Sequence, residues 1–207
     1  MAKPYYLKKK FLKKKLQDNV LFPLGYQDVH WTRVIQYRDC FDFIRTLKPE
    51  TLDVLEISAG HIFRETFNFK SFSETQYPDY DLEKGPLDRQ FDLIIADHVI
   101  LHLDKPILGV ANMRAMLKEG GHLIVTTPFL IKANLPPQDV HRWTERGLSN
   151  VMAEAGFDRA KVRTGAWGNR ACVVSNFTQW TPYGFGLFKS LKNEPDFPVS
   201  VWAFAKR

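Results

Sequence analysis

The sequence predicts an α/β fold, in which a doubly wound, mostly parallel sheet carries helices on both faces. Three short apolar runs support this prediction, at residues 52–60, 91–97 and 121–129. Runs of this kind are typical of strands buried on both faces of a parallel sheet. Because the carboxyl ends of parallel strands open onto one crevice, we expect Gly60, Asp97 and Thr127 to face the same cavity.

The elements between these strands follow from periodicity and from helix-breaking residues. Apolar residues recur at mixed helical spacing over residues 31–47, which predicts a helix packed on the sheet. Residues 69–81 alternate apolar and polar side chains until Pro78, so we expect a strand followed by a loop there. Pro106 is suited to begin a helix, and Gly120 is suited to end it.

The C-terminal part continues this alternation and then departs from it. Thr144 is a candidate N-cap for a helix that reaches Ala155. Strand and helix thus alternate from residue 52 to about residue 166, as in βαβ units. Residues 167–198 are instead rich in Trp, Phe, Pro, Asn and Gly, and the last residues have the composition of a strand. We therefore expect an aromatic-rich insertion before a final strand.

Composition limits the class of protein. A chain of 207 residues fits one domain and needs no disulfide to stabilise its core. Cys40 and Cys172 lack any CxxC or metal-binding spacing, so we expect two reduced, packed thiols and a cytoplasmic location. No run reaches the ~18 apolar residues of a membrane span. Lysines interrupt every apolar stretch near the N-terminus, which argues against a secretory signal.

Positive charge is concentrated at one end of the chain. The net charge is +6, yet seven lysines lie within the first fifteen residues, so the rest of the chain sums to −1. We predict a basic arm over residues 1–28 and one domain over residues 29–207. Apolar residues of the arm fall near one side of a helical wheel: Leu7, Phe11, Leu12 and Leu16. The pattern leaves open a solvated extension, a weak contact with an anionic membrane surface, and contact with a polyanion.

Four short motifs follow one another along the chain: VLEISAG at 54–60, FDLIIAD at 91–97, LKEGGHL at 117–123 and AGF at 155–157. Together they resemble the class I S-adenosylmethionine-dependent methyltransferases, in particular the type 11 methyltransferase domain that acts on small molecules. The resemblance covers residues 30–160. It implies a Rossmann-like, doubly wound, mostly parallel seven-stranded sheet with helices on both faces, and S-adenosylmethionine as the cofactor.

The resemblance also implies which residues bind the cofactor after the first strand. The first motif of the family is Glu-x-Gly-x-Gly, in which Glu56 matches the acid and Gly60 the second glycine, while Ser58 replaces the first glycine. Ser58, Ala59 and Gly60 are all small enough for a close approach of the backbone to the cofactor. This turn lacks the G-x-G-x-x-G pattern, which argues against a dinucleotide.

Acids farther along the chain complete the implied cofactor site. Glu74 is the nearest acid to the end of the second strand, and Asp81 falls in the region that usually contacts adenine. Asp97 would point toward the methionine portion of the cofactor or toward the acceptor. His98 would lie at the cofactor edge.

Methyl transfer to a hydroxyl also requires removal of a proton, for which histidine is the natural base near neutral pH. We favour His141, with Asp139 close enough in sequence to orient it. His98 is a second candidate, and His102 is a third that matches a family Leu-x-His pattern and has a structural role as its alternative. No D-x-D-type cluster is evident, so we expect no metal.

The expected partner is a small-molecule or glycan acceptor. The resemblance extends over residues 136–202 to bacterial members near glycan pathways, which favours a saccharide hydroxyl. N-methylation, methylation of a small aromatic hydroxyl, a silent cofactor-binding scaffold and a homodimer are left open. We do not expect nucleic acid, because no Asn-Pro-Pro-Tyr-type motif follows Asp97. Residues 167–170 and the aromatics after them are expected to form a lid over the acceptor, or else to cover the sheet edge.

Overall fold

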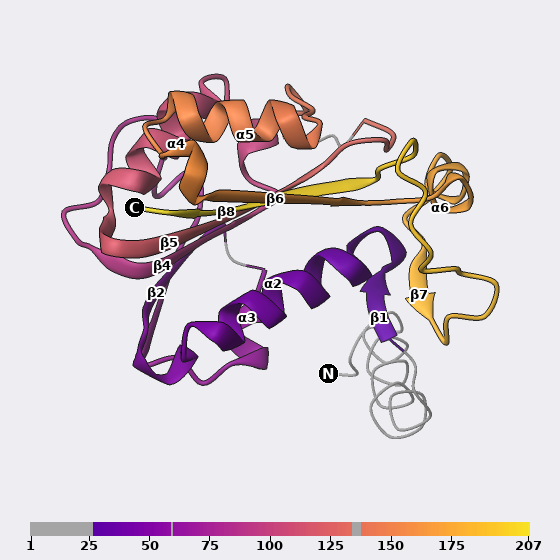
Figure 1. Cartoon of the computed structure of the whole chain (residues 1–207), viewed down its shortest axis with the longest axis horizontal. Helices are drawn as coiled ribbons and strands as arrows, with labels where there is room; N and C mark the ends of the chain where they lie inside the picture. The colour runs from indigo at the N-terminus through magenta and orange to yellow at the C-terminus, as the bar shows by residue number, and fades with distance from the viewer. Residues whose placement is uncertain (1–26, 59, 134–137) are drawn as a thin grey trace, which may run out of the picture.

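The computed structural model describes residues 27–58, 60–133 and 138–207. Its centre is a six-stranded sheet in the order β3-β2-β4-β5-β8-β6 (Figure 1). The strands are β2 (Asp53–Ile57), β3 (Ser71–Thr75), β4 (Phe91–Asp97), β5 (Leu117–Pro128), β6 (Val162–Trp167) and β8 (Ser200–Lys206). Strands β3, β2, β4 and β5 run parallel, and β8 runs antiparallel between β5 and β6. The predicted mostly parallel α/β fold is confirmed.

This sheet has six strands among the described residues, whereas the resemblance implied seven. The difference lies at the edge beside β3, where residues 76–90 form turns and add no strand. Pro78 and Pro86 cannot donate backbone hydrogen bonds to a strand ladder. The hydroxyl of Tyr80 donates instead to the carbonyl of Gly85 at 2.8 Å, which closes the segment on itself. Tyr80, Leu82 and Leu87 of this segment pack against the hydrophobic core on one face of the sheet. We call residues 76–90 the covering loop.

Helices cover both faces of the sheet (Figure 1). They are α2 (Val34–Thr46) and α3 (Ile62–Thr66) on one face, and α4 (Pro106–Ala115) and α5 (Glu145–Glu154) on the other. Ile44 and Phe63 pack with Leu93 of β4 on the first face, and Val110 and Met152 belong to the core of the second face. None of the helices that the structure describes is long and apolar enough to cross a membrane.

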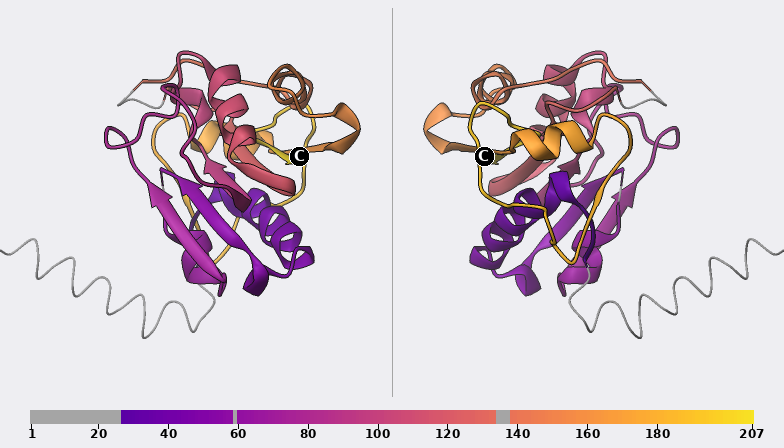
Figure 2. Two further views of the ribbon diagram at one scale, coloured as in Figure 1. Left: turned by 90° about the vertical axis from the view of Figure 1, so that its left-hand side faces the viewer. Right: turned by 90° about the vertical axis from the view of Figure 1, so that its right-hand side faces the viewer.

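A two-stranded sheet lies beyond the end of the main sheet at which β4 and β5 terminate. In it, β1 (Gln27–His30) pairs antiparallel with β7 (Pro182–Gly184), so that Gln27 lies opposite Gly184. The right-hand view of Figure 2 looks onto this end, with α6 (Arg170–Ser175) and the chain around β7 in front. The predicted arm lies outside the described residues except for its last two.

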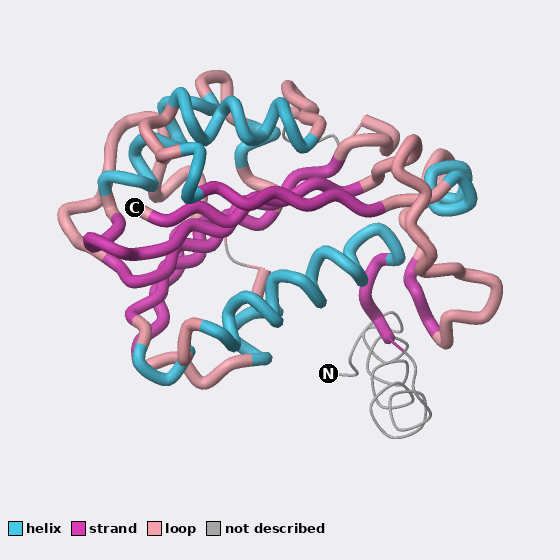
Figure 3. Tube along the Cα trace, in the orientation of Figure 1, coloured by secondary structure: helices cyan, strands magenta, loops and turns pink. Residues whose placement is uncertain are grey.

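The helix boundaries agree with the sequence at two starts and differ at one end. Thr144 caps α5, because its side-chain oxygen accepts a hydrogen bond from the backbone of Gly147 at 3.2 Å. Pro106 is the first residue of α4. The predicted end of that helix at Gly120 is wrong, since α4 ends at Ala115 and β5 takes up the chain at Leu117 (Figure 3).

Cys40 and Cys172 are buried, free thiols. Burial raises the pKa of the Cys172 thiol to about 12, so this thiol stays protonated near neutral pH. Both side chains belong to the hydrophobic cluster under α2. They act as small apolar groups in the core.

Candidate active site

A cavity of about 350 Å³ opens where β2 and β4 end. It is lined by Ser58, Tyr77, Asp81, Glu83, His98, Val99, His102, Leu103, Asp104 and Gln138. Its volume falls at the lower end of the range of roughly 300 to 1,000 Å³ that small-molecule sites occupy. Ser58 follows β2 and His98 follows β4, in agreement with the expected crevice at the strand ends. The three residues that were expected to face it are not among the lining residues: Gly60 and Asp97 lie close to Ser58 and His98 in the sequence, and Thr127 is fully buried.

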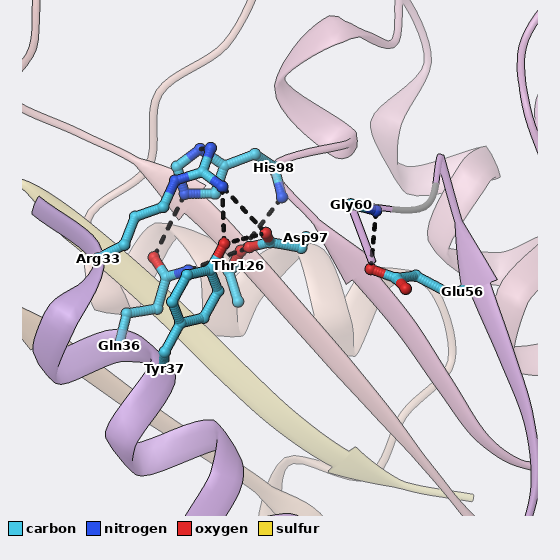
Figure 4. A network of polar contacts seen from close by, with 8 residues as sticks. All are labelled: Arg33, Gln36, Tyr37, Glu56, Gly60, Asp97, His98 and Thr126. Carbon is cyan, nitrogen blue, oxygen red and sulfur yellow. Dashed lines mark hydrogen bonds and ion pairs between the residues drawn. The ribbon is translucent and has the colours of Figure 1, made fainter. Parts of the chain in front are cut away.

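The end of β2 carries a buried carboxylate with one free oxygen. Glu56 Oε1 accepts a hydrogen bond from the backbone of Gly60 at 3.2 Å (Figure 4). Glu56 Oε2 is buried and has no hydrogen-bond partner among the described residues. Burial raises the pKa of Glu56 to about 7, and this outweighs the opposing hydrogen bond from Gly60. A buried carboxylate with an unused oxygen is suited to receive a cationic hydrogen-bond donor.

Ser58 occupies the turn after β2, at the position where the family motif has its first glycine. Ser58 has φ 55°, in the left-handed region that favours glycine. Its backbone N–H donates to the carbonyl of Thr75 at 2.9 Å, which fixes the turn against the end of β3. At Gly60 an added Cβ would meet only Glu56 Oε1, at 4.0 Å. The protein therefore leaves open space beside this glycine. Ala59 lies outside the described residues.

The end of β4 carries a second buried carboxylate, and this one is fully engaged. Asp97 accepts hydrogen bonds from the side chains of Arg33, Gln36, Tyr37 and Thr126 (Figure 4). Burial alone would raise the pKa of Asp97, but the nearby Arg33 guanidinium and the other donors hold that pKa below its usual value. The carboxylate therefore stays ionised and joins β4 to the start of α2. This arrangement leaves it little capacity for the predicted contact with a cofactor.

His98 is held on both sides by the same group of residues. Its Nδ1 accepts from the guanidinium of Arg33 at 3.0 Å, so its Nε2 carries the proton and faces the Gln36 side-chain oxygen at 3.3 Å. Burial and the Arg33 charge lower the pKa of His98 to about 3. The ring is neutral and both its nitrogens are occupied, which makes it a weak base although it lines the cavity.

Asp81 lines the cavity on the side of the covering loop. Its carboxylate accepts from the backbone of Glu83 at 3.0 Å and lies 3.7 Å from the Lys84 ammonium. Glu83 in turn accepts from the backbone of Lys105 at 2.6 Å, which connects this loop to the start of α4. Glu74, the other acid considered for the cofactor, pairs with Arg64 at 2.9 Å. The structure thus brings Asp81 to the cavity and turns Glu74 toward α3.

His102 lines the cavity with one ring nitrogen in use. Its Nδ1 contacts the backbone carbonyl of Gln138, and the Gln138 side chain donates to the carbonyl of His102. Because a carbonyl can only accept, Nδ1 carries the proton, and Nε2 of the neutral ring carries a lone pair. This reciprocal pair fixes the ring in the tautomer that a general base requires.

His141 and Asp139 are arranged differently from the prediction. The His141 ring stacks on Trp143 with centroids 5.2 Å apart, and its Nε2 is buried without a hydrogen-bond partner among the described residues. The Asp139 carboxylate is engaged through both oxygens by Arg142, which differs from the expected role of orienting His141. Neither His141 nor Asp139 is one of the residues that line the cavity.

Residues 167–170, which were predicted to be part of a lid over the acceptor, form hydrogen bonds within the aromatic-rich segment instead. The Asn169 side chain donates to the carbonyls of Ser190 at 3.0 Å and Lys192 at 3.2 Å, and the Trp167 indole donates to the carbonyl of Leu191 at 3.0 Å. Residues 167–170 therefore hold the following chain against the end of β6. None of the aromatics predicted for the lid lines the cavity, so covering of the sheet edge is the better interpretation.

Sequence reasoning missed three residues of this site, namely Arg33, Gln36 and Tyr37. Their spacing of three and four residues places them on one face of a helix, which was a usable signal. Tyr77, Glu83 and Gln138, which line the cavity, were missed as well. In the described residues, no three His, Cys, Asp or Glu side chains gather as potential metal ligands.

Comparison with known families identifies the fold and the class of enzyme. A family model described as a methyltransferase domain matches residues 9–162. The chain belongs to this methyltransferase domain family. The expected class I S-adenosylmethionine-dependent methyltransferase is thus confirmed at the level of family and fold, and S-adenosylmethionine is the cofactor.

Curated relatives share only part of this methyltransferase. The malonyl-[acyl-carrier protein] O-methyltransferase of Halalkalibacterium halodurans is 30% identical over 94 residues, which is 44% of this chain and 34% of that protein. The tenellin synthetase of Beauveria bassiana is 30% identical over 124 residues, which is 53% of this chain and 3% of that protein. Each match spans well under two thirds of the relative.

Solved structures show the same fold over most of the methyltransferase. The N-methyltransferase NodS from Bradyrhizobium japonicum has a TM-score of 0.53 at 15% identity, over 96% of this chain and 97% of that chain. The phosphoethanolamine N-methyltransferase 2 of Haemonchus contortus has a TM-score of 0.53 at 10% identity, over 83% of this chain and 52% of that chain. At these identities the likeness concerns the fold.

The residues present in this methyltransferase fit its cofactor. The open space at Gly60 admits a ligand close to the backbone, and the unpaired Glu56 Oε2 is suited to accept from the cofactor ammonium. Asp81 lines the cavity together with Ser58, which lies between Glu56 and Gly60 in the sequence. Ser58 supplies the left-handed turn between Glu56 and Gly60.

Proposed function

We propose that this methyltransferase methylates a hydroxyl of a saccharide or another small polar molecule, with His102 as the general base. The observation that carries the proposal is the fixed tautomer of His102 in the wall of the cavity. S-adenosylmethionine supplies an electrophilic methyl group when it is bound. A free hydroxyl is a poor nucleophile near neutral pH, so the protein must remove its proton.

The His102 ring meets the requirements for this step. Its Nδ1–H is held by the Gln138 carbonyl, so the lone pair on Nε2 is available to take the hydroxyl proton. The carbonyl also stabilises the imidazolium that forms, since Nδ1–H continues to donate to it. His98 lacks this capacity, because Arg33 and Gln36 occupy both of its nitrogens.

The remaining residues orient the reactants. Glu56 and Asp81 would hold the two ends of the cofactor, and the open space at Gly60 lets the backbone approach it. Positioning of this kind contributes a large share of the rate of a displacement reaction. Asp97 has a positioning role, because its ion pair with Arg33 fixes the backbone that carries His98.

The lining of the cavity supports a polyhydroxy acceptor. Asp104, Glu83 and Gln138 present hydrogen-bonding groups near His102. Tyr77 lies at the same cavity and is 72% exposed, so its ring offers a flat apolar surface. Sites for polar ligands combine a few placed polar groups with such aromatic walls.

The proposal is tested by kinetics of His102→Asn with His141→Asn as the matched control. Asparagine keeps a donor for the Gln138 carbonyl but cannot take a proton. After an acceptor screen that begins with glycans, we expect His102→Asn to lower kcat by about 10² to 10⁴-fold with unchanged cofactor binding in calorimetry. A comparable loss in His141→Asn but not in His102→Asn would move the base to His141.

Methylation of an amine is the second candidate. Asp81, Glu83 and Asp104 line the cavity, and no lysine or arginine is among its lining residues. An acidic wall favours a cationic acceptor as well as the cationic cofactor. A neutral amine already has a lone pair, so an N-methyltransferase would lose much less activity in His102→Asn than an O-methyltransferase.

A further inference from the structure

A second concavity lies at the edge of the main sheet. It is an open groove of about 550 Å³ beside α5 and the edge strand β6. Figure 1 shows α5 above β6. Among the described residues, the groove shares no lining residue with the cavity at the ends of β2 and β4. We call it the arginine groove, and its lining residues are Glu145, Arg146, Ser149, Asn150, Arg159 and Thr164.

Two separate elements bring arginines to this groove. Arg146 and Asn150 lie four residues apart on α5, so their side chains share one face of the helix. Another face attaches the helix to the core through Leu148, Val151 and Met152. Arg159 belongs to η5 (Arg159–Lys161), which leads into β6. Arginines from a helix and from the turn before a strand therefore line one concavity.

Both arginines lack a counter-charge in the part of the chain that the structure describes. Within residues 27–58, 60–133 and 138–207, neither Arg146 nor Arg159 forms an ion pair or a side-chain hydrogen bond. Two arginines and one acid, Glu145, give the lining a net charge of +1. Arg146 also lies in the first turn of α5, where the helix dipole disfavours a cation. Helix stability therefore does not account for this arginine, whereas a bound anion would offset its charge.

We propose that the arginine groove binds a small polar molecule through a phosphate group that this molecule carries. Guanidinium groups bind phosphate oxygens through paired, charge-assisted hydrogen bonds. Ser149, Asn150 and Thr164 add neutral donors and acceptors, which suit hydroxyl groups on the rest of the ligand. The volume lies within the range of roughly 300 to 1,000 Å³ that small-molecule sites occupy. A nucleic acid strand would instead require cations spread along a path, together with aromatic rings for its bases.

The proposal is tested by NMR of the full chain, with the backbone amides of the groove residues as reporters. The probes are inorganic phosphate, glucose 6-phosphate, glucose and a short single-stranded DNA, at constant ionic strength. The variant is Arg146→Gln/Arg159→Gln. The matched control is Arg38→Gln/Arg45→Gln, which removes two exposed arginines from α2 and leaves the same net charge. Circular dichroism melts check the fold of both variants, and calorimetry with S-adenosylmethionine checks the active site separately.

We expect phosphate and glucose 6-phosphate to shift the groove amides of the native chain, and glucose to leave them unchanged. Affinity for phosphate should fall roughly tenfold or more in Arg146→Gln/Arg159→Gln and stay within about twofold in the α2 control. Glu145→Gln should raise this affinity roughly two- to fivefold, because it removes a repulsive charge from the lining.

Four outcomes would overturn the proposal. One is equal affinity for phosphate in the two double variants, and another is weaker binding in Glu145→Gln. Exclusion of glucose 6-phosphate from a groove that binds phosphate would rule out a phosphate ester. Groove amides that respond to the DNA at lower concentration than to glucose 6-phosphate would assign the groove to nucleic acid.

Discussion

The guanidinium of Arg33 lies 3.1 Å from the carboxylate of Asp97, and the two residues come from different layers of the molecule. Arg33 precedes α2, whereas Asp97 is the last residue of β4. The same guanidinium reaches the His98 ring at 3.0 Å. One cation therefore neutralises the buried acid, holds the adjacent histidine neutral and locks the start of α2 to the end of β4.

Arg33→Leu should destabilise the protein because it leaves Asp97 buried without its counter-charge. We expect the free energy of unfolding to fall by about 3 kcal/mol, a little below the range for fully buried pairs, since the Arg33 side chain is 31% exposed. The matched control is Arg45→Leu in the last turn of α2, which breaks an exposed pair with Asp42 and should cost about 0.5 kcal/mol or less. Urea denaturation measures both. Equal effects would mean that the Arg33 pair has no special role in stability.

Glu56→Gln should stabilise the free protein at high pH and weaken cofactor binding. The folded pKa of about 7 lies above the ordinary value of 4.5, so the neutral acid stabilises the fold. That contribution is complete below the unfolded pKa and is lost as the pH rises through the folded one. At about pH 8 we expect the free energy of unfolding of Glu56→Gln to exceed that of the native chain by about 2 kcal/mol, with no difference at about pH 4.

The same substitution has an opposite effect on ligand affinity. Ionised Glu56 should bind the cofactor ammonium better than the neutral acid, so the affinity of the native protein should rise with pH through about 7. Glu56→Gln should bind more weakly and lose most of this dependence. Calorimetry over that pH range measures the effect. A pH dependence that is identical in the two proteins would remove Glu56 from the cofactor site.

Ser58→Gly should be tolerated by the fold and by the cofactor site. Ser58 adopts φ 55°, where glycine carries no steric penalty. We therefore expect the free energy of unfolding to rise by about 0 to 1 kcal/mol, after subtraction of the entropy that glycine adds to the unfolded chain. Ser58→Val should instead lose about 1 to 2 kcal/mol, because a β-branched residue fits this region poorly. Thermal melts of both variants give the comparison. Similar stability of the two variants would mean that the turn relaxes.

Local patterns predicted most of the fold, and the errors occur where tertiary packing decides. The cap at Thr144 and the start at Pro106 are local chemistry, and the structure retains both. The end of α4 was misplaced because Leu117 continues the apolar spacing of the helix, although it already belongs to β5. Gly120 was taken to end a helix, whereas it lies inside β5, where it adopts φ 75°.

The position of the active site could be predicted from the sequence, but the hydrogen-bond partners of its side chains could not. The strand-end rule predicted a cavity at the ends of β2 and β4, but Ser58 and His98 line it and the expected Gly60, Asp97 and Thr127 do not. It could not show that residues about sixty positions earlier would saturate Asp97, because that pairing depends on how α2 packs on the sheet. The choice among the histidines stays a prediction, because it depends on packing in the same way. His141 was favoured from sequence proximity to Asp139, yet the backbone carbonyl of Gln138 orients His102 instead.

Two glycines that look alike in sequence should respond to alanine in opposite ways. At Gly60 a Cβ would meet no atom closer than 4.0 Å, so Gly60→Ala should leave stability within about 0.5 kcal/mol of the native value. At Gly168 it would lie 2.0 Å from the Phe197 carbonyl oxygen and 2.5 Å from the Val199 nitrogen, both of which are backbone atoms. Gly168→Ala should therefore lose about 2 to 4 kcal/mol, because the chain that it ties must move.

The same two variants should differ in cofactor affinity in the opposite sense, with the more stable Gly60→Ala binding more weakly. The methyl group of Gly60→Ala would occupy the open space beside Glu56, so we expect affinity for S-adenosylmethionine to fall by roughly tenfold or more. Folded Gly168→Ala should bind the cofactor normally, since Gly168 packs against the backbone of Phe197 and Val199 and away from the turn after β2. Thermal melts and calorimetry on both proteins provide the four values. Normal affinity in Gly60→Ala would remove Gly60 from the cofactor site, because a ligand that approaches this backbone closely would contact the added methyl group.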